Sequence, residues 1–405
     1  MSNILRNKVI IVTYHFPPEA TGGSSRIYEM ARSLQDFYDV TILCPPPTYP
    51  FTKYKNPKYL LRKENVKGFC VYRLWNFQPT KQYPSLFQRL VYYGVFPILA
   101  LFFLLTHLRE VSFVIISVPP SPLLITSLAV RLFRKKLIID VRDFWIDLAV
   151  SLSYIKKDSI IVKWARKFEE YCWRKSDMIT TNSRIIYETL ISNRKKPHNS
   201  KIKYFPFTVD LKIFKRVNGS RTQKQIVYIG NLGSAQNLKA LINAVPLVLQ
   251  KVTDLRIQLY GGGDCEPKIK NLARDLNIDQ YIKFNGLVPR EQIPSILSES
   301  TLGIIALSSN NVVRYALPTK SFEYFASGLP VVAYGSSDEL ELIMSESGAG
   351  VYVRGDDKKD IADAIINVIN DKIALAQYSV NGRKFAENNT FHSLISDVQT
   401  LIEEK

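Results

Sequence analysis

Short apolar, β-branched runs alternate with stretches of helical periodicity from one end of the chain to the other. In the first helical stretch, Ile27, Met30, Ala31 and Leu34 recur at intervals that place them on one face of a helix. Strands that alternate with helices predict parallel sheets joined by right-handed crossovers. The predicted strands are 9–14, 40–43, 113–118, 137–140 and 178–181 in the first half, and 226–229, 255–259, 281–284, 302–306 and 330–333 in the second.

This alternating order occurs twice, which predicts an α/β protein with two doubly wound, Rossmann-like domains. Residues 206–224, a stretch with Pro, Lys and Gly, form the predicted linker. Two such domains that face one another hold a ligand cleft at the carboxyl ends of their strands. We expect an N-terminal domain over 1–208, a C-terminal domain over 209–385, and a last helix over 386–405 that packs back on the N-terminal domain.

One segment departs from the pattern of a water-soluble α/β protein. Residues 90–108 hold no Asp, Glu, Lys or Arg and have the length of a membrane-spanning helix. Spanning would place parts of one sheet on opposite sides of a bilayer, because a predicted strand follows at Phe113. Two interpretations remain open: a helix buried against the sheet, and an exposed helix that dips into the membrane interface through side chains such as Phe102 and Phe103.

The net charge of the chain is concentrated in one half. The chain has 54 Lys and Arg against 36 Asp and Glu, a formal net charge of +18. Residues 1–205 hold 32 basic and 14 acidic side chains, whereas residues 206–405 hold 22 of each. Apart from a plain solvated surface, such asymmetry predicts a polyanionic partner, either nucleic acid or an anionic membrane. We expect the membrane and no nucleic acid, because no nucleic-acid-binding motif is visible.

The cysteines and histidines suggest no metal chemistry. The four cysteines are scattered and predict neither a disulfide framework nor a metal knuckle. No Asp-x-Asp motif occurs, and the four histidines lie far apart in sequence. We therefore expect neither a metal nor another cofactor. The beginning of the sequence shows no secretory signal, so the cytoplasm is the expected location.

Glycine-bearing turns follow several of the predicted strands. The turn HFPPEATGGSS at 15–25 leads from the first strand into a helix. Glycines at such a turn let backbone amides approach a phosphate, and the helix N-terminus adds partial positive charge, although a single Gly-Gly turn can also serve the chain reversal alone. Further turns of this kind are IGNLGSAQN at 229–237, YGGGD at 260–264, NGLVP at 285–289 and LPTKSFEYF at 317–325.

In this order the turns resemble the donor domain of glycosyltransferase family 4, a family with the GT-B fold. The resemblance covers nearly the whole chain and is most specific over 226–353 and in the HFPPEATGG opening. It implies a retaining enzyme that takes a sugar from a nucleotide sugar, expected to be UDP-linked, without a metal. The tract GNLGSAQ with Pro-Thr-Lys is similar to transferases of deoxy-amino sugars or N-acetylhexosamines that act on lipid-linked saccharides.

The resemblance also implies roles for the residues at the matching positions. Glu323 would accept hydrogen bonds from the ribose hydroxyls of the donor, and residues 318–320 would face its diphosphate. Leu287 and Val288 would frame the nucleobase, and the turn at 22–23 would close over the phosphate and the transferred sugar. The donor-binding candidates are Gly22, Gly23, Gly230, Asn231, Gly233, Gly262, Leu287, Val288, Pro318, Thr319, Lys320 and Glu323.

The chain departs from the family pattern at two places. Tyr315 stands where members usually carry a first glutamate, eight positions before Glu323. Asn231 and residues 235–237 replace the basic residues that usually meet the diphosphate. Lys320, helix ends or another cation such as Arg314 must then neutralise this charge, and the identity of the sugar stays open.

Two titratable residues are candidates for the chemical step. Asp143 lies in IDVRDFWID at 139–147, which resembles an Arg-Asp-Leu-Trp-Pro element of the same subgroup. It would act near the attacking acceptor hydroxyl, or it would merely cap the following helix. His15, at the first turn, is the second candidate. In a retaining enzyme the leaving phosphate itself can also take the proton.

Together these features predict a transferase that is peripherally bound to the inner face of the cell membrane and glycosylates a lipid-linked or glycan acceptor. Two alternatives remain. A nucleotide-sugar epimerase or hydrolase of the same fold would need no acceptor. A non-catalytic membrane subunit would hold a sugar nucleotide for a partner, and its support is the tyrosine at position 315.

Overall fold

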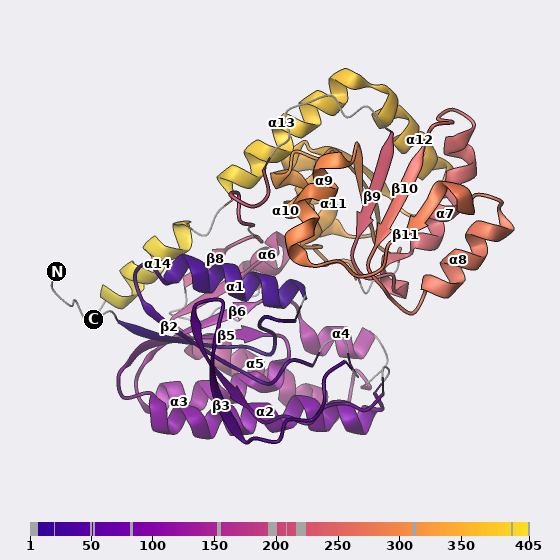
Figure 1. Cartoon of the computed structure of the whole chain (residues 1–405). Helices are drawn as coiled ribbons and strands as arrows, with labels where there is room; N and C mark the ends of the chain where they lie inside the picture. The colour runs from indigo at the N-terminus through magenta and orange to yellow at the C-terminus, as the bar shows by residue number, and fades with distance from the viewer. Residues whose placement is uncertain are drawn as a thin grey trace. The chain divides into compact units, whose positions relative to one another are not determined.

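Figure 1 shows a computed structural model of the 405-residue chain. The chain divides into two compact units, residues 1–206 with 391–405, and residues 207–390. The predicted boundary after residue 208 lies two residues from this division. The structure describes residues 7–19, 21–48, 51, 53–81, 84–151, 155–192, 201–207, 209–215, 224–309, 313–389 and 392–403.

The N-terminal unit is built on a sheet with the strand order β3-β4-β2-β1-β5-β6-β7-β8. All neighbours pair in parallel except β3 and β4, which form an antiparallel hairpin at one edge. The carboxyl ends of the parallel strands therefore share one edge. The strands are β1 (Lys8–Val12), β2 (Asp39–Cys44), β3 (Leu61–Val66), β4 (Phe69–Leu74), β5 (Val111–Val118), β6 (Lys136–Val141), β7 (Met178–Thr181) and β8 (Lys201–Tyr204).

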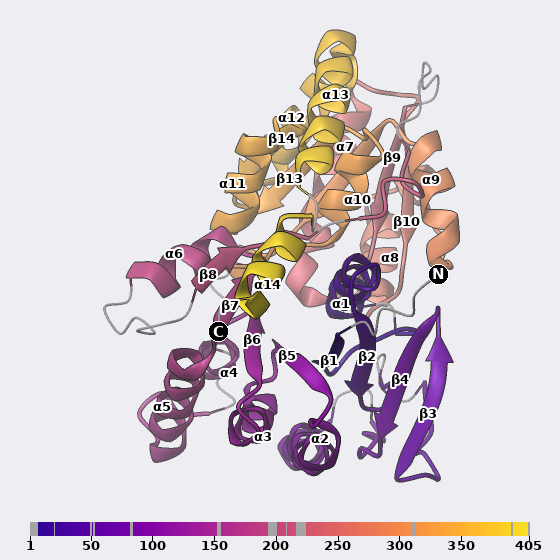
Figure 2. The same cartoon turned by 90° about the vertical axis from the view of Figure 1, so that its left-hand side faces the viewer.

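Helices cover both faces of this sheet (Figure 2). One face carries α2 (Leu86–His107), the 3-10 helix η1 (Ser121–Thr126), α3 (Ser127–Leu132) and α5 (Ile160–Lys175). The other face carries α1 (Gly22–Leu34) and α14 (His392–Glu403), which contributes Val398 and Leu401 to the core around α1. The remaining helices of the unit are α4 (Trp145–Ser151) and α6 (Arg184–Ser192).

The C-terminal unit contains an all-parallel sheet with the order β11-β10-β9-β12-β13-β14. Its strands are β9 (Gln225–Ile229), β10 (Arg256–Tyr260), β11 (Ile282–Phe284), β12 (Leu302–Ala306), β13 (Val331–Gly335) and β14 (Gly350–Arg354). One face packs against α7 (Leu238–Leu249), α8 (Glu266–Asp275) and α12 (Lys358–Asn370). The other packs against α9 (Ile293–Glu299), α10 (Lys320–Ala326), α11 (Asp338–Ser347) and α13 (Lys372–Asn388). Short 3-10 helices are η2 (Ser234–Gln236), η3 (Asp279–Tyr281) and η4 (Arg290–Gln292).

The predicted α/β class with two Rossmann-like sheets is confirmed, and each predicted strand is present. The strands β3, β4, β8 and β14 were not predicted. β3 is an exposed edge strand whose charged side chains, Arg62, Lys63 and Glu64 among them, hide the apolar alternation expected of a strand. The turn between β3 and β4 places Lys67 at φ 52° and Gly68 at φ 92°, the positive angles of a tight hairpin.

The long apolar segment forms the single helix α2. Ser85 caps its start by accepting a hydrogen bond from the Gln88 amide. Among the described residues, Phe87–His107 is the one helix long and apolar enough to cross a membrane, and 33% of its most apolar window is buried. Tyr92, Phe96 and Leu104 lie in the core of the sheet. The helix therefore combines a core-facing side with an exposed apolar side.

The structure separates the two phenylalanines that were expected to enter the membrane interface together. Phe102 is 61% exposed, whereas Phe103 is 7% exposed. The Phe103 ring stacks on His107 with centroids 3.9 Å apart and contacts Tyr72 at 5.0 Å. The expectation is wrong for Phe103, because the helical repeat turns neighbouring residues to different sides.

Candidate active site

Three glycine-bearing turns lie side by side at the carboxyl edge of the C-terminal sheet. The Leu232 amide, after β9, donates to the Gly262 carbonyl, after β10, at 3.0 Å. The Gly261 amide donates to the Gly286 carbonyl, after β11, at 2.7 Å. The structure thus brings together the predicted turns at 229–237, 260–264 and 285–289 in one rim.

Two glycines of this rim are required by close approach. Gly261 has a φ of +130°, and a Cβ atom there would lie 1.8 Å from the Gly230 carbonyl oxygen. Gly230 has a φ of +146°, and a Cβ atom there would lie 2.7 Å from the Lys320 Nζ. A side chain at Gly230 would therefore displace the ammonium that is the predicted phosphate contact.

The Lys320 ammonium is held above an aromatic ring at the rim. Its Nζ lies 3.7 Å from the centroid of the Tyr228 ring, and the Tyr228 hydroxyl donates to the Asn231 carbonyl at 2.7 Å. Burial lowers the pKa of Lys320 to about 7, against the opposing attraction of the Glu323 carboxylate. Binding of an anion next to this amine would therefore favour its protonated, charged form.

Glu323 lies one turn further along α10 and is 8% exposed. Its Oε1 is 3.4 Å from the Nη2 of Arg290, which begins η4 directly after the β11 turn. Burial raises the pKa of Glu323, while Arg290 and Lys320 act in the opposite direction. Arg290 was not among the predicted site residues, although it follows the NGLVP turn immediately.

The beginning of α10 leaves fewer amides for a phosphate than expected. The amides of Ser321 and Phe322 donate to the carbonyls of Pro318 and Thr319, each at 3.1 Å. Thr319 occupies the N-cap position without a side-chain cap bond. Because these two amides are engaged within the turn, they are not available to a phosphate. The Lys320 ammonium is then the candidate phosphate contact at the start of this helix.

The nucleobase candidates differ in exposure. Leu287 is 76% exposed on the β11 turn, whereas Val288 packs against the core below α10. An exposed apolar side chain beside polar turns is compatible with a surface for a flat base. Framing of the base by Leu287 and Val288 stays a prediction.

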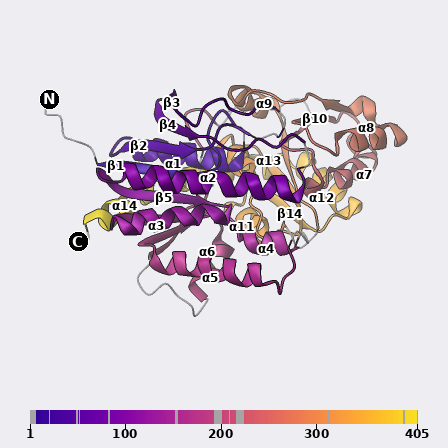
Figure 3. The same cartoon turned by 90° about the horizontal axis from the view of Figure 1, so that it is seen from below.

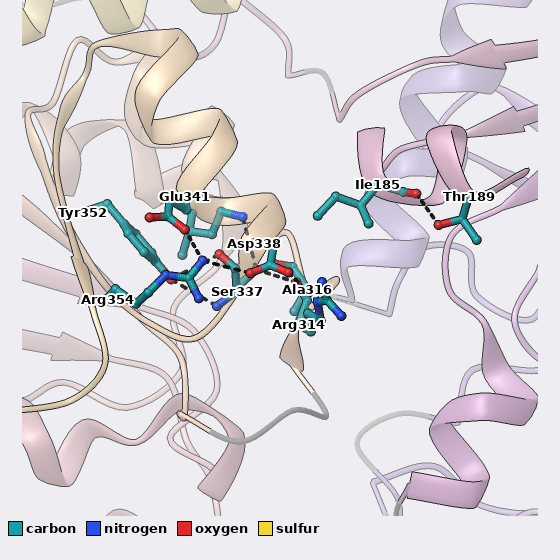
Figure 4. A network of polar contacts seen from close by, with 10 residues as sticks. Ile185, Thr189, Arg314, Ala316, Ser337, Asp338, Glu341, Tyr352 and Arg354 are labelled. Atoms are coloured by element: carbon teal, nitrogen blue, oxygen red, sulfur yellow. Dashed lines mark hydrogen bonds and ion pairs between the residues drawn. The ribbon is translucent and has the colours of Figure 1, made fainter. Parts of the chain in front are cut away.

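Arg314, the other cation considered for the diphosphate, is engaged elsewhere. Figure 4 shows Arg314 and Arg354 on either side of Asp338. Arg354 pairs with Asp338 at 2.9 Å and also contacts Glu341. Both guanidinium groups hold the pKa of Asp338 below its usual value. A role for Arg314 at the diphosphate would require it to leave this network.

In the N-terminal unit, His15 is oriented by a carboxylate. Its Nδ1 lies 3.0 Å from the Oε2 of Glu19, which is buried and accepts the Thr48 amide through Oε1 at 2.6 Å. A carboxylate at Nδ1 favours the tautomer that leaves Nε2 as a proton acceptor. The sequence analysis missed Glu19, although it stands four residues after His15 in HFPPE.

The predicted Gly22–Gly23 turn begins α1 and lies beneath an arginine. Thr21 caps the helix by accepting the Ser24 amide at 3.1 Å. A Cβ atom on Gly23 would lie 2.1 Å from the Nη1 of Arg142. The absence of a side chain at Gly23 therefore leaves room for the Arg142 guanidinium over the first turn of the helix.

Asp143 follows this arginine and is open to solvent. The surrounding protein partly desolvates its carboxyl and raises its pKa, against the pull of Arg142, and contact with solvent limits the rise. Helix α4 begins two residues later at Trp145. Within the described ranges the Asp143 side chain makes no capping bond to α4. The structure therefore gives the capping alternative no support.

Residues 223–371 match the family described as glycosyl transferases group 1. Over 419 aligned residues, 97% of this chain and all of that protein, the chain is 23% identical to the putative colanic acid biosynthesis glycosyl transferase WcaI of Escherichia coli (strain K12). The fold is similar to that of sucrose-phosphate synthase from Thermosynechococcus elongatus, with a TM-score of 0.70, 14% identity and 98% of both chains covered. It is also similar to Anabaena HepE in complex with UDP, with a TM-score of 0.71, 13% identity, and 98% of this chain and 100% of that one covered.

The chain is a GT-B glycosyltransferase. The resemblance predicted from the glycine-bearing turns and the predicted enzyme class are thereby confirmed. The individual donor-binding and catalytic residues remain predictions, which the geometry above makes specific.

A buried ion pair supports the loop that carries the catalytic candidate Asp143. Arg26 on α1 and Asp140 at the end of β6 are both fully buried, with Nη2 and Oδ1 2.7 Å apart. Ser117 and Thr180 donate their hydroxyls to the same carboxylate at 3.0 and 2.9 Å. The Arg26 Nη1 also donates to the Phe205 carbonyl at 2.8 Å. This network fixes α1 against the end of β6, which Arg142 and Asp143 directly follow.

No group of three or more His, Cys, Asp or Glu side chains within the described part of the glycosyltransferase could hold a metal ion. Metal independence stays a prediction that activity in a chelator can test.

Proposed function

We propose that this glycosyltransferase transfers a sugar from a UDP-sugar to a lipid-linked acceptor at the cytosolic face of a membrane, with retention of anomeric configuration. The observation that carries the proposal is the buried Glu323 carboxylate beside Lys320 and Arg290 at the glycine-bearing edge of the donor sheet. A carboxylate can accept hydrogen bonds from both hydroxyls of a ribose. The neighbouring ammonium can meet the adjacent phosphates.

The proposed donor site places a positive charge beside the diphosphate leaving group, which becomes more negative during the reaction. When the bond from the sugar C1 to the diphosphate oxygen breaks, negative charge collects on the diphosphate. The Lys320 ammonium stabilises this charge in a partly buried site, where an ion pair is stronger than in water. UDP as the nucleotide is supported by HepE, a protein of similar fold that was solved in complex with UDP.

The acceptor oxygen forms the new bond to C1 as the diphosphate departs, and the acceptor proton must be taken up. Asp143 is the candidate base, since it is open to solvent and its pKa is raised. His15 is the second candidate, because Glu19 orients its ring. Retention is carried over from the family resemblance.

The membrane part of the proposal rests on an exposed apolar face of the N-terminal unit. Figure 3, like Figure 2, shows α2, α3 and α5 along one face of the sheet. Large apolar side chains stand exposed on all three helices. An apolar surface of this kind marks an interaction site. The exposed members are Phe87, Leu90, Ile98, Phe102, Leu128, Leu132, Ile160, Ile161 and Trp164.

Basic side chains lie on or directly after two of the helices that carry this apolar face. Lys163 and Lys167 lie on α5, where the Lys167 Nζ is 5.8 Å from the Trp164 ring, and Arg131 and Arg134 lie at the end of α3. Apolar side chains that enter an interface, together with cations at headgroup level, are the features of a protein that lies on an anionic leaflet. A lipid-linked acceptor would be reached from this surface.

Calorimetry with a panel of nucleotides tests the donor part. We expect the purified enzyme to bind UDP and a UDP-sugar, and to bind GDP and ADP at least tenfold more weakly. Equal affinity for all three diphosphates would contradict a uridine-specific donor site. Absence of any nucleotide binding would contradict the proposed function as a whole.

A further inference from the structure

The apolar helix α2 contains a break in its own hydrogen bonding that a neighbouring side chain repairs. Pro97 lies inside the helix and has no amide hydrogen, so it cannot donate to the Tyr93 carbonyl one turn earlier. The Tyr14 hydroxyl donates to this carbonyl at 2.9 Å and also reaches the Tyr92 carbonyl at 3.3 Å. A side chain from outside α2 therefore supplies the hydrogen bond that the proline removes.

Tyr14 is held in this place by burial as well as by its hydroxyl. It is 1% exposed, and its ring meets the Phe96 ring edge-on with centroids 5.1 Å apart. A buried tyrosine hydroxyl is costly unless it forms a hydrogen bond, and the α2 carbonyls meet this need. Because Tyr14 directly precedes His15, the same contact ties the loop that carries His15 to α2.

A second contact joins the same turn of α2 to the loop that carries Asp143. The Tyr93 ring meets the Trp145 ring with centroids 5.4 Å apart and planes at 73°. Trp145 begins α4 two residues after Asp143. Aromatic pairs in this edge-on arrangement attract one another in a direction-dependent way. Tyr93 thus takes part in both connections, because its carbonyl accepts from Tyr14 and its ring contacts Trp145.

We propose that Tyr14 is a positioning residue for His15, and that the turn of α2 from Tyr92 to Pro97 is the frame that holds the loops of His15 and Asp143. This inference rests on the proposed function, in which these two residues are the candidates for uptake of the acceptor proton. Since α2 also contributes to the exposed apolar face, the same frame would hold both loops at a fixed place relative to a membrane surface.

The test compares Tyr14→Phe with the double variant Tyr14→Phe/Pro97→Ala. Tyr14→Phe removes only the hydroxyl. Adding Pro97→Ala returns an amide to position 97, so the Tyr93 carbonyl can accept a bond within the helix while the His15 loop stays detached from it. Thr126→Val is the matched control, because it also removes a buried hydroxyl, one that donates to the Leu123 carbonyl at 2.7 Å in η1 and belongs to neither loop.

Turnover, UDP affinity, chemical denaturation and amide hydrogen exchange are measured for each variant. We expect Tyr14→Phe to lower kcat about tenfold and to leave the Kd for UDP within about twofold, since a misplacement of about 1 Å can cost about 100-fold in rate. Residues 13–19 and 142–148 should exchange faster than in the wild type. The double variant should regain most of the lost denaturation midpoint but keep the low kcat and the fast exchange of 13–19. Thr126→Val should keep the wild-type kcat and exchange.

A hydrogen bond that serves stability alone would give a different pattern. In that case kcat and the exchange of 13–19 would recover in the double variant together with the denaturation midpoint. Such a recovery would overturn the positioning role, as would wild-type kcat and exchange in a folded Tyr14→Phe enzyme. Should Tyr14→Phe fail to fold, the double variant is compared with Pro97→Ala under the same two criteria.

Failure of the proposed function would be recognised separately. Hydrogen exchange needs no acceptor, so in a wild-type protein that transfers no sugar it would still decide whether Tyr14 holds the His15 loop to α2. A wild-type enzyme that transfers sugar, with the same kcat and exchange in Tyr14→Phe, would keep the function and remove the positioning role.

Discussion

Glu323 and Lys320 share one short helix, but the proposed function gives them different tasks, which different ligands can separate. Glu323→Gln removes the buried carboxylate proposed to hold the ribose, so uridine and UDP should both bind more weakly. Charged hydrogen bonds contribute about 1.5–3 kcal/mol each, so we expect a loss of roughly 2–3 kcal/mol, or about 30-fold or more in Kd. Calorimetry of Glu341→Gln, an exposed partner of Arg354, provides the matched control. Unchanged uridine affinity in Glu323→Gln would remove this carboxylate from the ribose site.

Lys320 should make UDP binding dependent on pH. Its pKa of about 7 means that the free enzyme holds the ammonium charged below pH 7 and neutral above it. Because a diphosphate prefers the charged form, UDP affinity should fall above pH 7, by up to about tenfold per pH unit. Lys320→Met should bind UDP more weakly at pH 6 and lose this fall, while uridine binding stays the same. A wild-type UDP affinity that is flat from pH 6 to pH 8.5 would contradict a titrating ammonium at the diphosphate.

Asp143 is expected to act on turnover and not on donor binding. Asp143→Asn keeps the size of the side chain and removes the base, so kcat should fall by about 100-fold, the lower range for general bases. The Kd for UDP should stay within about twofold of the wild type. Asp147→Asn, an exposed aspartate that pairs with Arg166, is the control. A fully active Asp143→Asn enzyme would assign the proton to the leaving phosphate or to His15.

Site residues that lie close together in the sequence could be predicted, whereas partners from distant segments could not. Glu323 and Lys320 lie in one turn of one helix, so their motif revealed both. Arg290, in η4, reaches Glu323 in α10, and Arg142, after β6, reaches Gly23 in α1. Such partners depend on which strands are neighbours, and a linear pattern does not contain that information. Glu19 is the exception, since its spacing from His15 was visible.

Among the elements, α2 joins a core-facing side to an exposed apolar side, and separate substitutions can test each side. Leu90 and Phe102 are exposed, so the double change to serine should leave the fold intact and weaken the salt-resistant part of liposome binding. Phe37→Ser, an exposed phenylalanine after α1, is the matched control. Flotation with anionic vesicles measures both. Equal flotation of the double variant and the wild type in high salt would contradict insertion of this face.

Phe103→Ser should behave in the opposite way. Phe103 packs on Tyr72 and His107 in the core, so its loss should lower the free energy of unfolding by about 3 kcal/mol. Chemical denaturation measures this change. A stability loss below about 0.5 kcal/mol would place Phe103 outside the core.

The composition of this segment predicted a long apolar helix, and α2 is that helix. Composition did not predict which side meets the sheet, because nearly every position from 90 to 108 is apolar. The contacts with the sheet and with η1 select the buried stripe. By contrast, the largely buried parallel strands, such as β5, β6 and β12, were predictable, since their apolar, β-branched runs repeat the same pattern. The charged edge strand β3 was not, because its side chains face solvent.

At the scale of the whole molecule, the two units divide the proposed work. The C-terminal unit holds the donor candidates, and the N-terminal unit holds the acceptor candidates, the excess of positive charge and the exposed apolar face. Positive charge from Lys320 would replace a metal at the diphosphate. We therefore expect turnover to persist in excess EDTA, measured as sugar transfer per minute. Complete loss of activity that magnesium restores would reveal a cation site.

Sugar transfer to a lipid-linked acceptor can be tested by measuring release of UDP from a UDP-sugar by the purified enzyme, with and without vesicles that carry a prenyl-diphosphate-linked saccharide. We expect UDP to appear only when the acceptor is present, with one sugar added to the lipid for each UDP released, and we expect Glu323→Gln to suppress both. Equal release of UDP without acceptor would indicate a hydrolase or an epimerase. Binding of UDP-sugar without any release would indicate a non-catalytic subunit, and either result would contradict the proposed transfer.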